Sequence, residues 1–357
     1  MNITIDCRML GYSGVGVYLE GCLPKLLDSS HDFLLFGESK KILDLTGIRN
    51  NITIEECEIK SFSLAELFSF PKQLLKKINN GDIYYSPYFN IPGGIKVPVF
   101  VTIHDIIFPD MPELVSFIGL WSRMYFYRRA FRLSSAIFTV SAFSKSRIEH
   151  HLGEKKPIIN ASNAVNDFFL EALPEKILKR KQILFIGNIK KHKGLSILLD
   201  AFLSAREEGF DYELIIIGNK DNFRSGDRES ISRLENLENK GVKFTGFISD
   251  IEKRRLLAES ALLVQPSLYE GFGYPPLEAM MSGTMALISD IPVFREVYGD
   301  FPVTFFKAGD SADLKGKMIR LLSDKGLQSI ELPVHLKKKY SFKKTAKIVL
   351  EKLEKHY

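Results

Sequence analysis

Residues 262–288 read LLVQPSLYEGFGYPPLEAMMSGTMALI, and their pattern is the clearest guide to the architecture of the chain. The apolar runs Leu262–Val264 and Ala286–Ile288 have the length and composition of buried strands. Between them we expect a helix at Pro276–Ser282. Proline favours the first position of a helix, because the N–H group that it lacks would have no hydrogen-bond partner within the helix there. A strand, a helix and another strand in this order predict a parallel sheet covered by helices.

The same alternation extends over the rest of the chain. The further runs that we predict as strands are Ile3–Ile5, Phe33–Phe36, Ile83–Tyr85, Val97–Ile103, Ala136–Val140, Ile183–Ile186, Leu214–Ile217 and Val242–Phe244. Examples of stretches that we predict as helices are Val17–Leu27, Leu64–Ile78 and Val115–Leu133 in the first half, and we expect further helices near Leu195–Ala205, Glu229–Glu238 and Glu252–Ser260. Between Asn163 and Lys181 the pattern lapses into Asn, Asp, Pro and Lys, which indicates a linker.

These features predict an α/β protein with two doubly wound, Rossmann-like domains. We place the first domain at residues 1–168, the linker at 169–181, the second domain at 182–340 and a final helix at 341–357. Doubly wound sheets bind ligands beyond the carboxyl ends of their strands, so two such domains that face each other form a central cleft. The residues at those strand ends are therefore the candidates for function.

The composition is that of an ordinary globular protein and argues against several classes. Of 357 residues, 45% are hydrophobic, and no apolar run approaches the ~18–20 residues of a transmembrane helix. The chain begins MNITIDCRML, with Asp6 and Arg8 where a signal peptide needs an apolar core. The three cysteines form no CxxC pair, which argues against a disulfide scaffold or a thiolate zinc site and favours the cytoplasm.

The net charge of +6 is concentrated near the C-terminus. Residues 333–357 contain eight lysines and two glutamates, so the rest of the chain is close to neutral. Nucleic-acid-binding domains usually present a basic face over a whole domain, with aromatic side chains that stack on bases. We therefore expect no nucleic-acid partner.

A turn with several glycines follows the first predicted strand and contains Gly14 and Gly16. Glycines between a strand and a helix let backbone N–H groups approach a phosphate at the positive end of the helix. A dinucleotide fingerprint requires a third glycine, which this sequence lacks at the required position. The turn therefore argues against an NAD-dependent dehydrogenase, and a tight turn without a ligand is the alternative interpretation.

His104 and Asp105 follow the predicted strand that ends at Ile103. A histidine at the carboxyl end of an apolar strand is directed at the predicted cleft. Its position alone leaves two interpretations open, a part in the reaction or a structural role.

Glu270 and Glu278 flank a glycine loop in the stretch quoted first. We expect Glu270 to end a strand, Glu278 to lie in the first turn of the next helix, and the backbone N–H groups of Phe272 and Gly273 to be exposed between them. Carboxylates accept hydrogen bonds from hydroxyls, and amides at a helix start hold an anion. The segment therefore suits a polyhydroxyl ligand that carries a phosphate.

A second loop, Gly187–Gly194, joins a predicted strand to a predicted helix and contains Lys190, Lys191 and Lys193. An ammonium group is a compact charge that suits a diphosphate. A solvated basic loop without a ligand is the alternative interpretation.

Together these segments resemble the retaining GT-B glycosyltransferases of family four, the glycosyl transferases group 1. The resemblance covers nearly the whole chain and is strongest over residues 183–290. Its most specific element is a pair of glutamates separated by seven residues, here Glu270 and Glu278. It implies the GT-B fold, with two Rossmann-like domains that face a central cleft and a final helix that crosses back to the first domain.

The resemblance also assigns roles to residues. It implies that Glu270 contacts the hydroxyls of the donor sugar and that Glu278 binds the ribose hydroxyls of its nucleotide. It implies that Lys193 holds the diphosphate and that His104 lies beside the transferred sugar, so His104 and Glu270 are the catalytic candidates. The other residues that it places at the donor are Gly14, Gly16, Gly187, Asn188, Phe247, Gly271, Phe272, Gly273 and Leu277.

One position departs from the family pattern. Asn188 stands where many relatives carry an arginine after the strand. An amide cannot supply the second cation, so either Lys190 or Lys191 replaces it or this subgroup differs.

The implied reaction moves a hexose, with retention, from a nucleotide-sugar such as GDP-mannose or UDP-glucose to a glycan or lipid-linked acceptor in bacterial surface polysaccharide synthesis. The departing nucleoside diphosphate requires stabilisation by a metal or by fixed cations and helix ends. The sequence contains no Asp-x-Asp, so we expect neither a metal nor a cofactor. A nucleotide-sugar epimerase of the same shape and a non-catalytic binding module are the alternatives.

The region between Glu113 and Glu149 contains no acidic residue but many arginines and aromatic residues, including Trp121 and Arg132. Such a helix can lie at an anionic lipid interface, which would bring the protein to the inner face of the cell membrane. It can equally bury its apolar residues while its arginines face water.

Overall fold

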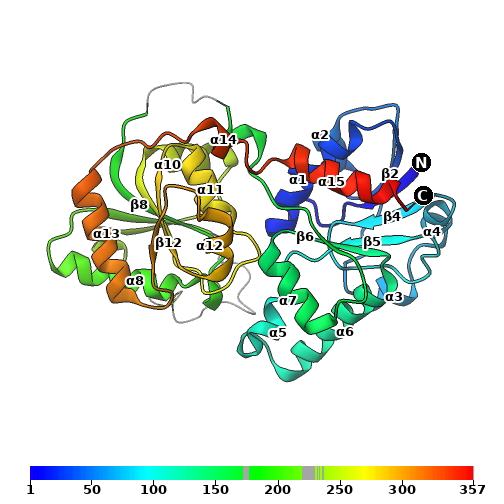
Figure 1. Cartoon of the computed structure of the whole chain (residues 1–357), viewed down its shortest axis with the longest axis horizontal. Helices are drawn as coiled ribbons and strands as arrows, with labels where there is room; N and C mark the ends of the chain where they lie inside the picture. Colours follow the sequence, from blue (N-terminus) through cyan, green and yellow to red (C-terminus); the bar gives the residue numbers. More distant parts are fainter. Residues whose placement is uncertain (172–176, 219–229, 231, 233, 235–236, 357) are drawn as a thin grey trace. The chain divides into compact units, whose positions relative to one another are not determined.

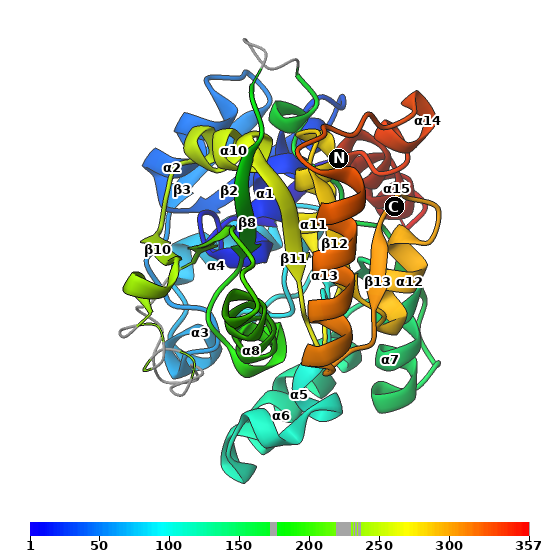
Figure 2. The same cartoon turned by 90° about the vertical axis from the view of Figure 1, so that its left-hand side faces the viewer.

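The computed structural model describes residues 1–171, 177–218, 230, 232, 234 and 237–356. The chain divides into a first unit, Met1–Asn166 with Tyr340–Tyr357, and a second unit, Asp167–Lys339. Each unit is a parallel sheet with helices on both faces, as predicted (Figures 1 and 2). No helix in the described part of the chain is both long enough and apolar enough to cross a membrane.

The first unit contains a seven-stranded sheet in the order β3-β2-β1-β4-β5-β6-β7. Its strands are β1 (Asn2–Asp6), β2 (Asp32–Gly37), β3 (Ile52–Glu56), β4 (Ile83–Ser86), β5 (Val99–Thr102), β6 (Ala136–Thr139) and β7 (Ile158–Asn160). Its helices are α1 (Ser13–Leu27), α2 (Ser39–Thr46), α3 (Leu64–Phe68), α4 (Lys72–Asn79), α5 (Ile107–Asp110), α6 (Phe117–Leu133), α7 (Ala142–Leu152) and α15 (Phe342–Glu354).

Two features of the first unit differ from the prediction. The sequence pattern missed the two edge strands, β3, which is only partly buried, and β7, which has only three residues. The helix predicted over residues 64–78 is two helices, α3 and α4, separated near Pro71. Proline lacks the N–H group that a continuing helix would need and restricts the residue before it, so the chain turns there.

The last helix belongs to the first unit, and Figure 1 shows α15 beside α1. Ser341 caps this helix by accepting a hydrogen bond from the N–H of Lys344. The buried side chains of α15 include Phe342, whose ring lies over Gly21 of α1. A Cβ atom at Gly21 would lie 2.0 Å from that ring, so a glycine is required for this close packing.

The second unit contains a six-stranded sheet in the order β10-β9-β8-β11-β12-β13. Its strands are β8 (Arg180–Ile186), β9 (Glu213–Ile217), β10 (Val242–Gly246), β11 (Ser260–Gln265), β12 (Met285–Ser289) and β13 (Thr304–Phe306), of which β13 was not predicted. Its helices are α8 (Leu195–Glu207), α10 (Asp250–Glu259), α11 (Tyr274–Met281), α12 (Pro292–Tyr298), α13 (Ser311–Lys325) and α14 (Val334–Lys337). The helix predicted at Glu229–Glu238 lies mostly outside the described residues.

The strand orders locate one switch point in each sheet. In the second unit, the chain runs outward from β8 to β9 and β10, and then returns to the other side of β8 with β11. In the first unit, the same reversal separates β1 from β4. The loops at the carboxyl ends of such neighbouring strands diverge and leave room for a ligand.

Candidate functional site

The loops after β8 and β11 meet at the switch point of the second unit. After β8, the chain forms a short 3-10 turn, Lys191–Lys193, that ends at Gly194. Gly194 has φ +68°, and a Cβ atom there would lie 2.0 Å from the carbonyl oxygen of Pro266 in the other loop. The N–H of Leu268 donates a hydrogen bond of 2.7 Å to the carbonyl of His192. These backbone contacts fix the two loops to each other.

The fixed loops bring Lys193 and Glu270 together. Lys193 Nζ lies 2.7 Å from Glu270 Oε1 and 2.8 Å from Oε2. Ser267 Oγ donates a further hydrogen bond of 2.7 Å to Oε1, and Gln265 Nε2 donates one of 2.9 Å to Ser267. The Lys193 side chain is 21% exposed and that of Glu270 is 9% exposed. A cation and an anion of fixed orientation therefore lie at the same point, within reach of solvent.

The start of α11 differs from the prediction in three respects. The strand ends at Gln265, five residues before Glu270, so Glu270 lies within the loop. The helix begins at Tyr274, so Glu278 lies beyond its first turn. Phe272 and Gly273 are buried rather than exposed, because this segment packs on α12.

Gly273 holds the start of α11 in place. Its φ is +86°, and a Cβ atom there would lie 2.5 Å from the ring of Phe294. The Tyr298 hydroxyl donates a hydrogen bond to the Gly273 carbonyl. The conformation and the close packing both require glycine at this position.

Glu278 lies in α11 and is buried against a lysine that the sequence analysis missed. Lys253 Nζ, on α10, lies 3.1 Å from Glu278 Oε1 and 3.0 Å from Asp250 Oδ1. Burial raises the pKa of the Glu278 carboxyl, and the charge of Lys253 partly offsets that rise. Lysines recur along surface helices, so the sequence around Lys253 gave no signal that distinguished it.

The other residues predicted in this unit occupy varied environments. The N–H of Gly187 donates a hydrogen bond of 2.9 Å to Ile217, which joins the ends of β8 and β9. Asn188 and Gly271 are half-buried in the two loops at the switch point. Leu277 is fully buried, so only its backbone could meet a ligand, whereas the Phe247 side chain is 87% exposed.

His104 follows β5 in the first unit, at the carboxyl edge of its sheet. Its Nε2 lies 2.8 Å from the carbonyl oxygen of Pro87, which can only accept, so Nε2 carries the proton. The ring meets Tyr18 edge-on at 5.0 Å between centroids. Burial lowers the pKa of His104 to about 4. The imidazole is therefore neutral near pH 7, and its Nδ1 is a hydrogen-bond acceptor.

Gly14 and Gly16 lie inside α1 and not in a turn before it, because the helix begins at Ser13 instead of Val17. The N–H of Gly16 donates a hydrogen bond of 2.9 Å to the carbonyl of Tyr12. A Cβ atom at Gly16 would lie 2.9 Å from the backbone nitrogen of Gly11. Gly16 thus permits the close approach of the preceding loop to the first turn of the helix.

The carboxyl edge of the first sheet also contains a buried polar cluster that the sequence analysis missed. Arg8 Nε lies 2.9 Å from Asp6 Oδ1, and Arg8 Nη2 lies 2.6 Å from Glu66 Oε1. Tyr84 donates a hydrogen bond to Asp6, and Asn90 donates to both carboxylates. All of these side chains are almost wholly buried. The cluster joins the segment around α3 to the ends of β1 and β4.

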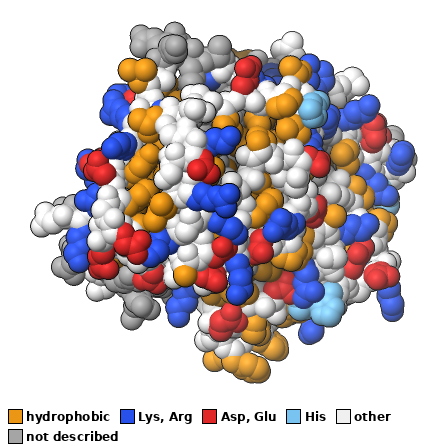
Figure 3. Space-filling model, turned by 60° about the vertical axis from the view of Figure 1, so that its left-hand side comes forward, with side chains coloured by type: hydrophobic (Ala, Val, Ile, Leu, Met, Phe, Trp, Pro, Cys, Tyr) orange, Lys and Arg blue, Asp and Glu red, His pale blue; other side chains and the backbone are white. Residues whose placement is uncertain are grey.

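The exposed face of α6 is apolar and basic. Phe117, Trp121 and Tyr125 recur at four-residue spacing and are exposed, with Trp121 68% exposed. Arg128 and Arg132 continue the same stripe toward the end of the helix. Figure 3 shows hydrophobic side chains gathered at its lower end, where Figures 1 and 2 place α6.

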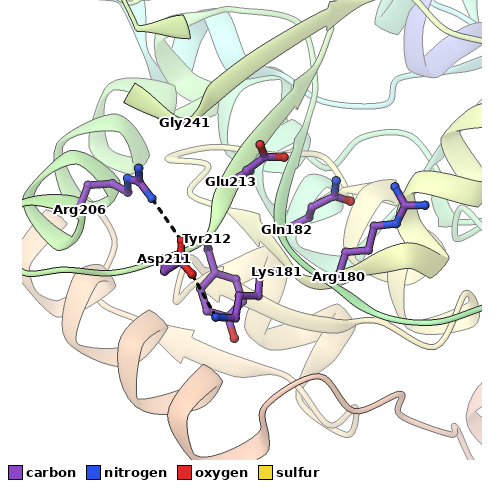
Figure 4. A pocket seen from close by; sticks show the side chains of 8 residues that line it. All are labelled: Arg180, Lys181, Gln182, Arg206, Asp211, Tyr212, Glu213 and Gly241. Atoms are coloured by element: carbon purple, nitrogen blue, oxygen red, sulfur yellow. Dashed lines mark hydrogen bonds and ion pairs between the residues drawn. The ribbon is translucent and has the colours of Figure 1, made fainter. Parts of the chain in front are cut away.

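A hollow of about 450 Å³ lies at the opposite edge of the second sheet, at the amino ends of β8 and β9. Figure 4 shows that Lys181 and Arg206 both point to Asp211, at 3.1 Å and 4.0 Å. Doubly wound sheets bind ligands at their carboxyl edge, and these cations already have a partner. We therefore place the candidate site at the loops after β8 and β11.

No group of three or more His, Cys, Asp or Glu side chains in the described ranges is arranged to hold a metal ion.

Comparisons with known proteins show which families and folds this chain is similar to. Residues 171–341 match the model of the family described as glycosyl transferases group 1. The O-antigen chain mannosyltransferase RfbU of Salmonella typhimurium is 31% identical over 204 residues, which are 55% of this chain and 53% of that protein. The phosphatidyl-myo-inositol mannosyltransferase of Mycobacterium leprae is 32% identical over 145 residues, 40% of this chain and 37% of that protein. The chain thus spans about half or less of the length of these relatives.

The fold is confirmed by a solved structure. Anabaena Alr3699/HepE, in its complex with UDP-glucose, superposes with a TM-score of 0.74 over 99% of this chain and all of that chain, at 17% identity. Its likeness shows that the two Rossmann-like units have the GT-B architecture, as predicted.

Proposed function

We propose that this chain, whose second unit belongs to the glycosyl transferases group 1, transfers a hexose from a nucleotide-sugar to an acceptor hydroxyl with retention of configuration. The observation that carries the proposal is the contact between Lys193 and Glu270 at the switch point of the second sheet. The sugar and the diphosphate are adjacent groups of a nucleotide-sugar. An ammonium and a carboxylate less than 3 Å apart can therefore serve both at once.

The proposed roles are those that the family resemblance implies, and the contacts at the switch point support them. Lys193 binds the diphosphate and stabilises the negative charge that develops on it as the glycosidic bond breaks. Glu270, oriented by Ser267, accepts hydrogen bonds from the sugar hydroxyls. Glu278 accepts hydrogen bonds from the ribose, and the exposed ring of Phe247 stacks beside the base.

Retention requires that the acceptor oxygen attack from the face that the diphosphate leaves. The departing phosphate is itself a base, so it can take the proton of the incoming hydroxyl. The neutral His104 would assist as an acceptor for a hydroxyl of the transferred sugar. Lys190 or Lys191 would supply the cation that Asn188 cannot.

The substrate class is proposed from the relatives. The mannosyltransferases among them favour mannose as the transferred hexose and a bacterial surface glycan or lipid-linked saccharide as the acceptor. GDP-mannose and UDP-glucose are the first donors to test.

A panel of nucleotide-sugars, scored by release of nucleoside diphosphate and by thermal stabilisation, tests this proposal. We expect one donor to stabilise the protein and to be consumed only slowly without an acceptor. Each donor is also incubated alone and analysed for an epimerised sugar. Formation of an epimer would identify an epimerase, and binding without turnover on any acceptor would identify a binding module.

We also propose that the α6 stripe touches an anionic membrane, at the inner face of the cell membrane where lipid-linked acceptors lie. Exposed aromatic side chains followed by arginines suit the boundary between acyl chains and acidic headgroups. Trp121→Ala should lower the fraction of protein that co-sediments with vesicles containing phosphatidylglycerol, and high salt should lower that fraction further. Unchanged binding by the variant would contradict this contact.

A further inference from the structure

Lys253 is the least expected charged residue near the candidate site. It lies on α10, its side chain is 16% exposed, and its ammonium contacts the carboxylate of Glu278, which is 6% exposed. Burial lowers the pKa of the Lys253 ammonium, but Glu278 and Asp250 outweigh that effect and raise the pKa overall. The pair is therefore a cation and an anion held largely out of water.

Lys253 cannot easily move away, because α10 is held on several sides. Ser249 caps the helix through the N–H of Glu252. The ring of Phe169 lies 4.9 Å from Lys253 Nζ, and the ring of Phe168 lies 4.7 Å from the guanidinium of the buried Arg254. The ammonium of Lys253 therefore lies over the Phe169 ring while it donates a hydrogen bond to Glu278.

The contact with Lys253 influences both the protonation state and the orientation of the Glu278 carboxyl group. The hydrogen bond from Lys253 engages Oε1, which leaves Oε2 for a hydroxyl. A buried carboxylate without a partner cation takes up a proton more readily or turns toward solvent. A protonated or rotated carboxyl accepts hydrogen bonds from two neighbouring hydroxyls poorly.

We propose that Lys253 is a positioning residue for ribose recognition: it holds Glu278 as an oriented carboxylate that accepts hydrogen bonds from the ribose hydroxyls of the donor. This inference rests on the proposed function, since it requires a nucleotide at Glu278. It assigns to Lys253 no contact with the phosphates, which are left to Lys193.

The test compares ribose and deoxyribose nucleotides. UDP and GDP are titrated calorimetrically into the wild-type protein, and the tighter of the two is then compared with its 2′-deoxy form. Lys253→Met should weaken binding of the ribonucleotide at least about 10-fold and bring its affinity close to that of the deoxynucleotide. Lys253→Gln is tested in parallel, because it keeps a polar end without the charge.

Two controls separate positioning from a general loss of charge or fold. Arg255→Met removes a cation from the same helix, where Arg255 is 57% exposed and pairs with Glu259, and it should change affinity less than about 2-fold. In a Glu278→Gln background, Lys253→Met should add almost nothing, because the group that it positions is already changed. Thermal melting confirms that each variant is folded.

Each outcome has one meaning. If Glu278→Gln binds the nucleotide like the wild type, the site assigned under the proposed function is wrong, and this inference with it. If Glu278→Gln is weakened but folded Lys253 variants are not, only this inference is overturned. Equal weakening of ribo- and deoxyribonucleotides by Lys253→Met also overturns it, because the lysine then acts on another part of the nucleotide.

Discussion

The carboxyl edges of the two sheets have the same topology but use charge in opposite ways. At the edge of the first sheet, Arg8, Asp6 and Glu66 are almost fully buried and satisfy one another. At the edge of the second sheet, Lys193 and Glu270 are paired but remain within reach of solvent. Charges sealed inside a network fix a loop, whereas charges at an open strand end are available to a ligand. Position at a switch point is therefore a weaker guide to function than accessibility.

The largest effect should come from breaking the sealed network. Arg8→Met leaves two buried carboxylates without their cation, which should lower the free energy of unfolding by about 3–5 kcal/mol. Arg49→Met, which removes an exposed pair with Asp28, should cost less than about 1 kcal/mol. Urea denaturation followed by circular dichroism gives both values. If Arg8→Met lowered the free energy of unfolding no more than Arg49→Met does, the buried network would not stabilise the fold.

Removing the accessible cation should affect binding and turnover instead of stability. Lys193→Ala should lower the transfer rate and weaken nucleoside diphosphate binding by about 100-fold, because the developing charge loses its partner. The melting temperature should change little. Lys243→Ala, which removes an exposed lysine of the same unit that pairs with Glu213, is the matched control. Wild-type affinity of Lys193→Ala in calorimetry would refute the assignment.

Each edge also contains a histidine whose pKa burial lowers, to about 4 for His104 and about 3 for His192. The unfolded chain, where histidine titrates near pH 6.5, then binds more protons than the folded chain between these values. The contribution of each neutral histidine to the free energy of unfolding, about 1–3 kcal/mol, should therefore be fully present above pH 6.5. It should be lost as the pH falls toward 4 for His104 and toward 3 for His192. His104→Asn should flatten this dependence in denaturation at several pH values. An unaltered profile would contradict the buried, neutral state.

His104 should affect turnover more than nucleotide binding, because it lies in the first unit and the proposed nucleotide residues lie in the second. His104→Ala should slow transfer about 10-fold and change nucleoside diphosphate affinity less than about 2-fold. Rate assays and calorimetry on the same preparation measure the two effects. Equal losses in both would assign His104 a structural role.

The smallest effect should follow removal of divalent metal. If fixed cations such as Lys193 stabilise the departing diphosphate, transfer in excess EDTA should stay close to the untreated rate. A collapse of activity that manganese or magnesium restores would show that a metal performs this role.

The sequence predicted the fold well where patterns are local and strong. The buried strands of both sheets, such as β11 and β12, were recognised from their apolar runs. The missed strands β3, β7 and β13 lie at the edges of their sheets and all include polar residues, so their pairing depends on the neighbouring strand. Helices α3 and α4 were merged because their apolar spacing outweighed Pro71 in the prediction.

The candidate site was predictable in part for the same reason. Glycines and glutamates at fixed spacing within one loop identified the stretch from Glu270 to Glu278. The lengths of its strand and helix were misjudged by a few residues, which moved Glu270 into the loop and Glu278 beyond the first helical turn. Lys253 was missed because nothing local distinguishes it from the solvated basic residues beside it.

Local sequence patterns were enough to predict the α/β class, the two sheets and the motif that carries Glu270 and Glu278. These follow from hydrophobic periodicity and from glycine conformations, which act over a few residues. Tertiary structure alone decided which charges meet. Lys193 and Glu270 are 77 residues apart, Arg8 and Glu66 are 58 apart, and Lys253 and Glu278 are 25 apart. Each pair forms because parallel strands return every carboxyl end to the same edge, where burial then determines whether a charge supports the fold or stays accessible to a ligand.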